Sequence, residues 1–214
     1  GVAAVLDETD SIEQHIDDTM IAGAHLCEVN AVKQTVEGGK PSVDFLLKHG
    51  VQFTLDDQEQ LHLTREGGHS QRRIIHAADA TGRAISTTLV ERAIEKDIIT
   101  IFENYIAIDL ITSQKLGLEE QNNRALGLYV LDEKTEKVHT FLAPFTALAC
   151  GGAMKAYLYT SNPDIATGDG IAMAFRAGCR VANMEFNQFH PTCLYHPQAR
   201  SFLITEAMRG EGAY

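Results

Sequence analysis

Apolar residues recur every three or four positions through the first fifty residues, and this pattern predicts three helices there. The first begins at Ser11-Ile12-Glu13-Gln14, which fits a capping box because the first and fourth residues can bond each other's backbone N–H groups. Gly38-Gly39 should end the second helix, and Gly50 the third. The expected spans are 11–25, 29–37 and 42–49.

Short β-like runs follow, separated by glycine turns and further helical stretches. Gly67-Gly68 divides one pair of runs and the polar residues 132–136 divide another, so each pair is expected to form a hairpin. The small, apolar run Phe145–Ala149 is typical of a strand buried in a parallel sheet. Strands are expected at 51–54, 61–64, 72–77, 99–102, 105–112, 126–131, 138–142 and 145–149, and helices at 83–96 and 171–177. The mixture predicts an α/β fold with α+β elements, in which antiparallel strands are inserted.

The composition is that of an ordinary globular protein, since 44% of the 214 residues are hydrophobic and 22% are charged. The formal net charge of -11 argues against a nucleic-acid partner, which would need a basic surface. The four cysteines lie far apart without a CxxC pair, so they are expected to be reduced and mostly buried. No apolar run has the length of a membrane span and no signal peptide is evident, which predicts a cytoplasmic protein without membrane association.

The segment with the densest functional groups is 185–214, EFNQFHPTCLYHPQARSFLITEAMRGEGAY. Polar groups are costly to bury between apolar runs unless they bind something, so we expect half of a substrate site here. His190 follows an aromatic and amide stretch, where it either donates to a bound carboxylate or is a satisfied core histidine. Thr205-Glu206 either caps a helix or presents a hydroxyl and a carboxylate to a substrate.

Three glycine motifs are candidates for ligand contact. Gly67-Gly68, after Glu66, form either a surface turn or a place where the backbone approaches a flat ligand. Gly151-Gly152 follow a predicted strand, the position at which α/β folds bind nucleotides or flavins. Asp169, between two glycines ahead of a helix, either caps that helix or accepts a hydrogen bond from a ribose or ribityl hydroxyl. The GxGxxG fingerprint does not occur.

Most of the nine histidines give no functional signal. His15 and His25 fall in a predicted helix, where we expect them to be exposed. His190, Cys193 and His196 are spaced like metal ligands, but structural zinc usually needs four ligands and no second cluster supplies the rest. We therefore expect no metal, and Cys193 to be a small core residue.

Three blocks of the chain together resemble a known family: HLTREGGHSQRRIIHAADATGR, CGGAMKAYLYTSNPDIATGDGIAMAFRAGCRVANMEFNQFHPTCLYHP and FLITEAMRGEGAY. They are similar to the succinate dehydrogenase/fumarate reductase flavoproteins and, within that family, to the L-aspartate oxidases. The resemblance covers essentially the whole chain, with Cys150 at a position where the family more often has threonine. It implies an FAD-binding, Rossmann-like domain over 1–184 that lacks its first βαβ unit, and the start of a capping, substrate-binding domain over 185–214.

The resemblance also implies a site. His190, Thr205 and Glu206 would line a dicarboxylate pocket beside the flavin, with His190 in a catalytic role. Glu66 would be catalytic and would meet the α-ammonium of the substrate, whereas relatives that act on succinate or fumarate have an uncharged residue there. The residues that would approach FAD are Gly1, Ala107, Ile108, Gly151, Gly152 and Asp169.

The reaction implied is oxidation of L-aspartate to iminosuccinate in NAD (quinolinate) biosynthesis, with hydride passing to flavin N5 and reoxidation by oxygen or fumarate. Quinolinate synthase is a candidate partner. The alternatives are a fumarate reductase or succinate dehydrogenase flavoprotein, and a folded remnant without catalysis. The chain opens at Gly1 without methionine and stops directly after its most polar segment, so we expect a central fragment. The family's phosphate-binding βαβ unit and proton-transfer arginine would lie outside it, so the fragment is expected to be inactive and to bind FAD poorly or not at all.

Overall fold

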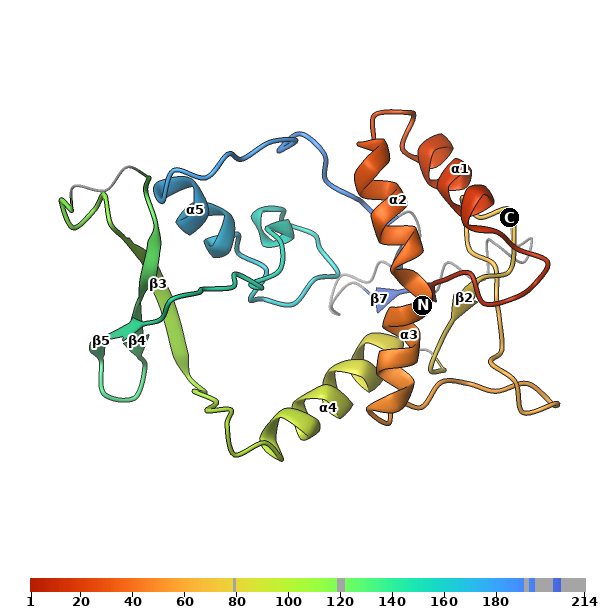
Figure 1. Cartoon of the computed structure of the whole chain (residues 1–214), viewed down its shortest axis with the longest axis horizontal. Coiled ribbons are helices and arrows are strands. Elements are labelled where there is room, and N and C mark those ends of the chain that lie inside the picture. The colour runs from red at the N-terminus through yellow and green to blue at the C-terminus, as the bar shows by residue number, and fades with distance from the viewer. Residues whose placement is uncertain (79, 119–121, 191–192, 195–201, 205–214) are drawn as a thin grey trace. The chain divides into compact units, whose positions relative to one another are not determined.

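The computed structural model of the chain describes residues 1–78, 80–118, 122–190, 193–194 and 202–204. The chain divides into two compact units, one of Gly1–Thr100 with Ile204–Tyr214 and one of Ile101–Leu203. Helices and strands are mixed along the sequence, as predicted (Figure 1). The predicted domain boundary between residues 184 and 185 stays a prediction.

The described part of the first unit confirms the predicted helices. Ser11 caps the first of them, since its hydroxyl oxygen accepts from the Gln14 N–H at 3.1 Å. This helix ends at Ala22, before the predicted residue 25. The N–H of Gly23, its C-cap, donates to the Thr19 carbonyl. Gly38 ends the second helix and directly precedes the third, so Pro41 lies in a first turn, where its missing N–H costs little. The elements are β1 (Val2–Ala3), α1 (Ile12–Ala22), α2 (Val29–Glu37), α3 (Gly39–Lys48), β2 (Ile74–Ile75) and α4 (Thr81–Ile94).

The two strands of this unit are short and antiparallel, with Val2 opposite Ile75 and Ala3 opposite Ile74. The hairpin predicted over 61–77 is present only as a bridge between Thr64 and Ile74, and Ile74 also pairs with Ala3 of β1. The core lies beside this pair and contains Ala4, Val43, Val51, Phe53 and Ile75. Burying each large member contributes about 1.5–3 kcal/mol.

A buried ion-pair cluster joins α1 and the residue before it to the segment that precedes β2. The Arg73 side chain is fully buried, and its Nε and Nη2 donate to the two carboxylate oxygens of Asp10, each at 2.7 Å. Its Nη1 donates to Asp18 Oδ2 at 2.7 Å. Asp10 precedes α1, Asp18 lies on α1 and Arg73 precedes β2. One guanidinium therefore connects three separate segments of the chain.

His15 also lies in this region, and the prediction that it is exposed is wrong, since it is only 7% exposed. Its ring centroid is 5.6 Å from that of His69, and the Nδ1 atoms of both rings are buried without a hydrogen-bond partner among the described residues. Burial, followed by the charge of Arg73, lowers the pKa of both imidazoles below the usual value. Both rings are therefore neutral at pH 7. His25 is exposed, but lies beyond the end of the helix.

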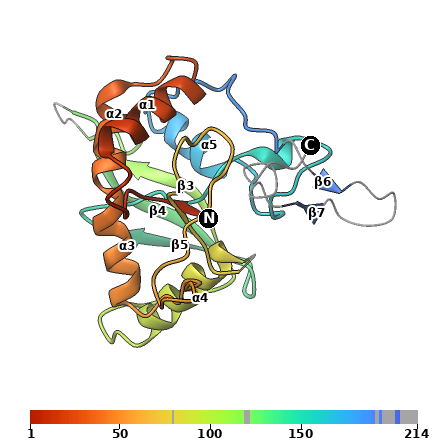
Figure 2. The same cartoon turned by 90° about the vertical axis from the view of Figure 1, so that its right-hand side faces the viewer.

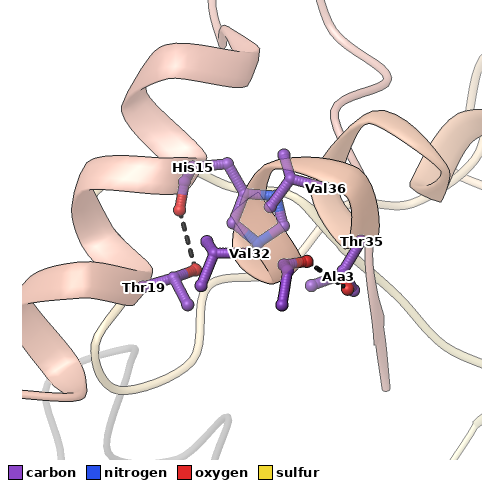
Figure 3. A pocket seen from close by; sticks show the side chains of 7 residues that line it. Ala3, His15, Thr19, Val32, Thr35 and Val36 are labelled. Atoms are coloured by element: carbon purple, nitrogen blue, oxygen red, sulfur yellow. Dashed lines mark hydrogen bonds between the residues drawn. The ribbon is translucent and has the colours of Figure 1, made fainter. Parts of the chain in front are cut away.

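Helices α1 and α2 lie side by side (Figures 1 and 2). Between them is a pocket of about 370 Å³ that also reaches Ala3 of β1. Figure 3 shows the His15 imidazole directed towards Val32 and Val36 of α2. The Thr19 and Thr35 hydroxyls in its wall donate to carbonyls of their own helices, so the lining is largely apolar.

The second unit is organised around the antiparallel sheet β3 (Tyr105–Thr112), β4 (Ala125–Asp132) and β5 (Lys137–Leu142), in that order. The strand predicted at 105–112 and the hairpin that follows it are thereby confirmed. Gly127 of β4 has φ +151°, and a Cβ there would overlap the Phe141 carbonyl oxygen on β5. The remaining elements are the 3₁₀ turn η1 (Met154–Ala156), α5 (Asp169–Arg176), β6 (Cys193–Leu194) and β7 (Phe202–Leu203). Gly178, at φ +89°, directly follows Ala177, the C-cap of α5.

Several predicted elements are wrong. Residues 51–54, 99–102 and 145–149 form no strand, and Phe145 is 89% exposed. A strand of a parallel sheet needs a hydrogen-bonded neighbour, and every strand pair among the described residues is antiparallel. All four cysteines are free as expected, but Cys27 is half-buried and the other three are exposed. No helix in the described part of the chain is long and apolar enough to cross a membrane.

Removing one carboxylate of the buried cluster should destabilise the chain strongly. Asp10→Ala is expected to lower the free energy of unfolding by about 3 kcal/mol or more, because Arg73 stays buried without two of its three carboxylate hydrogen bonds. Asp44→Ala is the control, since its pair with Lys40 on α3 is more than half exposed and should be worth about 0.2–1 kcal/mol. Urea unfolding followed by circular dichroism measures both; equal losses would contradict the role of the cluster.

Gly127→Ala should destabilise the sheet of the second unit by about 2 kcal/mol or more, because the backbone is in a region favourable only to glycine and the new Cβ would overlap Phe141. Gly82→Ala in α4 is the opposite case. Nothing lies within 4 Å of the added Cβ there, so alanine should stabilise the helix by about 0.5–1 kcal/mol. The melting temperatures of the two variants should therefore shift in opposite directions. A Gly127→Ala variant with an unchanged melting temperature would show that the close pairing of β4 and β5 at this residue is not required for stability.

Candidate active site

The predicted site residues are divided between the two units. Gly1 and Glu66 belong to the first unit, whereas Ala107, Ile108, Gly151, Gly152, Asp169 and His190 belong to the second. Thr205 and Glu206 lie outside the described residues.

Glu66 begins a tight turn, residues 66–70, which we call the glutamate turn. The His69 N–H donates to the Glu66 carbonyl at 3.3 Å, and Gly68 has φ +84°, a conformation that favours glycine. The chain on either side is closed by two backbone hydrogen bonds between Thr64 and Ile74, at 2.9 and 3.1 Å. The side chain of Glu66 is 26% exposed, so its carboxylate is partly desolvated but accessible.

Gly1, the predicted cofactor residue of this unit, lies against that carboxylate. Its nitrogen is 3.9 Å from Glu66 Oε1. A Cβ at Gly1 would overlap the Ile74 side chain and lie 3.1 Å from Glu66 Oε1, so only glycine fits beside the turn. The structure thus brings together one predicted cofactor residue and one predicted substrate residue.

In the second unit His190 lines a pocket of about 200 Å³. The same pocket is lined by polar side chains of Thr160, Ser161, Asn162 and Gln188. A wall of hydroxyl and amide groups around an imidazole offers several hydrogen-bond donors to a carboxylate. His190 is half-buried, and the aromatic wall includes Phe189, whose ring packs edge-on against Tyr157 at 4.9 Å.

Sequence reasoning missed most of the polar wall of this pocket. Thr160, Ser161 and Asn162 form a run of small polar residues directly after Tyr157-Leu158-Tyr159. This run lies inside a block that carries the family resemblance. Such a run resembles an ordinary loop, and the Asn162 N–H indeed bonds to the Thr160 hydroxyl at 3.1 Å. Gln188 stands two residues before His190 and could have been proposed from that spacing.

The predicted glycine turn at Gly151-Gly152 is in contact with the start of α5. The Gly168 N–H donates to the Gly152 carbonyl at 3.1 Å, and a Cβ at Gly170 would lie 3.0 Å from the Cβ of Cys150. In contrast, nothing lies within 4 Å of a Cβ built on Gly151 or Gly152. The backbone there faces open space, which leaves room for a flat or extended ligand.

Asp169 occupies the first turn of α5, but it is not the cap that one interpretation expected. The N-cap is Gly168, without a side-chain hydrogen bond. The Thr167 hydroxyl donates to Asp169 Oδ2 at 2.8 Å, which orients an otherwise exposed carboxylate. The partial positive charge of a helix N-terminus favours a carboxylate at this position. Its orientation leaves acceptor capacity for a ligand hydroxyl.

Ala107 and Ile108 lie on β3 where the register shifts, so Ile108 has no residue opposite it on β4. Arg176, in the last turn of α5, donates to the Ile108 carbonyl at 3.1 Å and to Asp109 Oδ1 at 3.2 Å. Burial raises the pKa of Asp109, but hydrogen bonds and charge from Lys115 and Arg176 outweigh burial and lower it. The two ends of α5 therefore contact two predicted cofactor segments.

These segments suit an extended cofactor. An eight-residue helix is about 12 Å long, so a compact ligand cannot reach both ends of α5, whereas a dinucleotide such as FAD can. The open backbone at 151–152 fits close approach by such a group. Among the described residues no cluster of three or more histidine, cysteine or acidic side chains could hold a metal ion. His196 of the H-x2-C-x2-H spacing lies outside them.

Comparison with known proteins identifies the family. A family model described as FAD binding domain matches residues 1–214. L-Aspartate oxidases from Acinetobacter baylyi and Pseudomonas aeruginosa are 86% and 59% identical to the chain, and each alignment covers 100% of it. The chloroplastic L-aspartate oxidase of Arabidopsis thaliana is 46% identical over 99% of the chain. The chain spans 39%, 40% and 33% of these three relatives.

Solved structures agree with this assignment. A mutant of E. coli quinol fumarate reductase aligns with a TM-score of 0.89 and 31% identity over 99% of this chain and 34% of its own. Mycobacterium smegmatis Sdh1 aligns with a TM-score of 0.83 and 29% identity over 98% of this chain and 36% of its own. The predicted resemblance to the L-aspartate oxidases and the predicted α/β FAD-binding fold are confirmed. The chain belongs to the FAD-binding domain family.

Proposed function

We propose that the protein to which this chain belongs oxidises L-aspartate to iminosuccinate with FAD, in NAD (quinolinate) biosynthesis in the cytoplasm. The observation that carries the proposal is the 86% identity to a named L-aspartate oxidase over the whole chain. The glutamate turn supports it, because a partly buried carboxylate suits an ammonium group. Oxygen or fumarate would accept the electrons, and quinolinate synthase remains the candidate partner.

FAD would be held by Gly1, by Ala107 and Ile108 on β3, by the open backbone of Gly151 and Gly152, and by Asp169 at the start of α5. The bound flavin would supply the two-electron oxidant, while the protein supplies binding, orientation and charge. Asp169 would accept from a hydroxyl of the cofactor, since Thr167 fixes its carboxylate and the helix N-terminus favours its charge.

The substrate would be a small dicarboxylate with an amine. His190 and the amide of Gln188 would donate to one carboxylate, with Thr205 and Glu206 completing that pocket. Glu66 would pair with the α-ammonium, which orients Cα for hydride loss. A site with a carboxylate built for this ammonium also selects against succinate, because Glu66 would be left partly buried without a partner.

A fumarate reductase or succinate dehydrogenase flavoprotein is the second candidate, and the TM-score of 0.89 to a fumarate reductase supports it. The identity to that structure is 31%, against 86% to an L-aspartate oxidase. Both reactions use a dicarboxylate and a flavin, so the pocket around His190 suits either. Glu66 is the residue at which the two candidates differ chemically.

Glu66→Gln in the full-length flavoenzyme should separate them. Loss of the charge that meets the ammonium is expected to lower kcat/KM for L-aspartate by about a hundredfold, while fumarate reduction largely survives. Glu37→Gln, at an exposed pair on α2, is the matched control and should change neither activity. Steady-state assays with both substrates decide the matter. If both activities fall together, or neither falls, Glu66 does not recognise an amine.

His190→Ala should instead affect both substrates, because each carries the carboxylate that the imidazole is proposed to bind. We expect KM for L-aspartate and for fumarate to rise by about tenfold or more. Gln188→Ala, in the same pocket, should raise both KM values by a smaller factor. His25→Ala, at an exposed position outside the site, is the control. A His190→Ala enzyme with normal KM for both substrates would remove this pocket from the proposal.

A further inference from the structure

We propose that Asp18 is a positioning residue for Glu66: it holds the glutamate turn in the place where Glu66 can meet the substrate's ammonium group. The inference rests on the proposed function, because it concerns how Glu66 is placed for the amine. Asp18 lies on α1, 52 residues before Ser70 in the sequence. It is not itself expected to contact the substrate.

One carboxylate oxygen of Asp18 receives three hydrogen bonds. The Ser70 N–H and the Ser70 hydroxyl each donate to Asp18 Oδ2 at 2.8 Å, and Arg73 Nη1 donates to the same atom at 2.7 Å. Ser70 is the last residue of the glutamate turn. Asp18 therefore connects the far end of the turn to a helix.

On the α1 side of this connection, Asp18 is held by a buried ion pair. Arg73 is fully buried, and the Asp10 carboxylate that binds it in a bidentate manner is 1% exposed. Asp18 is 14% exposed, so its bonds face little competition from water. The pair of Arg73 and Asp10 thus gives Asp18 a fixed reference point from which to hold Ser70.

Without Asp18, Ser70 would lose its hydrogen bonds to α1, and the backbone hydrogen bonds at the base of the segment that carries Glu66 would remain. Two backbone hydrogen bonds join Thr64 and Ile74 there, and the segment between them contains two adjacent glycines. Glycines leave such a segment many alternative conformations. Within the turn, Ser70 is linked to Glu66 through the adjacent His69, whose N–H bonds to the Glu66 carbonyl at 3.3 Å. A shift at Ser70 is therefore transmitted to Glu66.

Asp18→Ala in the full-length flavoenzyme tests this role. We expect kcat/KM for L-aspartate to fall about ten- to a hundredfold, because a displacement of about 1 Å in a positioned group has effects of this size. Fumarate reduction should change little, because fumarate has no ammonium group. Asp18→Asn keeps an oxygen that can accept from Ser70 and should recover part of the aspartate activity. Equal losses with both substrates would mean that Asp18 serves the fold alone, and would overturn the inference.

The double variant with Glu66→Gln gives a sharper result. If Asp18 acts through Glu66, adding Asp18→Ala to Glu66→Gln should cause almost no further loss of aspartate oxidation. A purely structural role predicts losses that multiply, and that result would overturn the inference. If the unsubstituted full-length enzyme does not oxidise L-aspartate, the proposed function fails. If Glu66→Gln leaves aspartate oxidation intact, Glu66 does not recognise the amine, and the inference about Asp18 is overturned. If Glu66→Gln abolishes aspartate oxidation but Asp18→Ala does not, only the inference fails.

Two further variants protect the test against misfolding. Asp17→Ala removes the neighbouring, exposed aspartate of α1 and should leave both activities and the melting temperature unchanged. Ser70→Ala removes one of the two bonds from the turn while leaving the buried Arg73 pairs in place. It should lower aspartate activity less than Asp18→Ala and leave fumarate reduction unchanged. If Asp18→Ala does not fold, Ser70→Ala decides, and normal aspartate kinetics in that variant would overturn the inference.

Discussion

The buried guanidinium of Arg73 is the interaction on which the first unit depends. Removing a cation from water is costly, and here the cost is offset by two carboxylates and three short hydrogen bonds. Asp10 and Asp18 approach from segments more than fifty residues away in the sequence. Hydrophobic burial alone would tolerate many packings of α1 against β2. The directional pairs with Arg73 favour one of them, as buried polar groups do in some other proteins.

The second unit also has an arginine that joins two segments, but its ion pair is more exposed and therefore weaker. Arg176 joins α5 to the register shift of β3, but its side chain is 48% exposed and Asp109 is 25% exposed. Exposed ion pairs contribute little, because water and salt compete for both partners. The turn that carries Glu66 is therefore fixed by the protein itself more firmly than the cofactor segments at α5. This difference suits the proposed chemistry, since a bound FAD would contact those segments directly and stabilise them by its own binding.

The parts of the fold that were predictable from the sequence are those with local signals. The helix beginning at Ser11 and the one ending before Gly178 were found because caps and periodicity are read within a few residues. The prediction of strands at 51–54, 99–102 and 145–149 was wrong. A strand forms only with a hydrogen-bonded neighbour, and apolar composition does not indicate which segment that neighbour is. The prediction that His15 is exposed was wrong for a related reason. Its neighbours along the helix are polar, but the residues that bury it are His69 and those of α2, which are distant in the sequence.

The site shows the same division. Glu66 and His190 could be proposed as site residues because the blocks that contain them resemble a family, and their roles stay predictions. Asp18 could not be proposed, since Asp17 and Asp18 are equivalent in any local reading of the helix. What distinguishes them is the direction of each side chain on α1: one is exposed, and the other meets Ser70 and Arg73. Under the proposed function, specificity for an amine would need more than the carboxylate that contacts it. It would also need the remote pairs that keep a glycine-containing turn in one conformation, and these become visible only when distant segments are placed together.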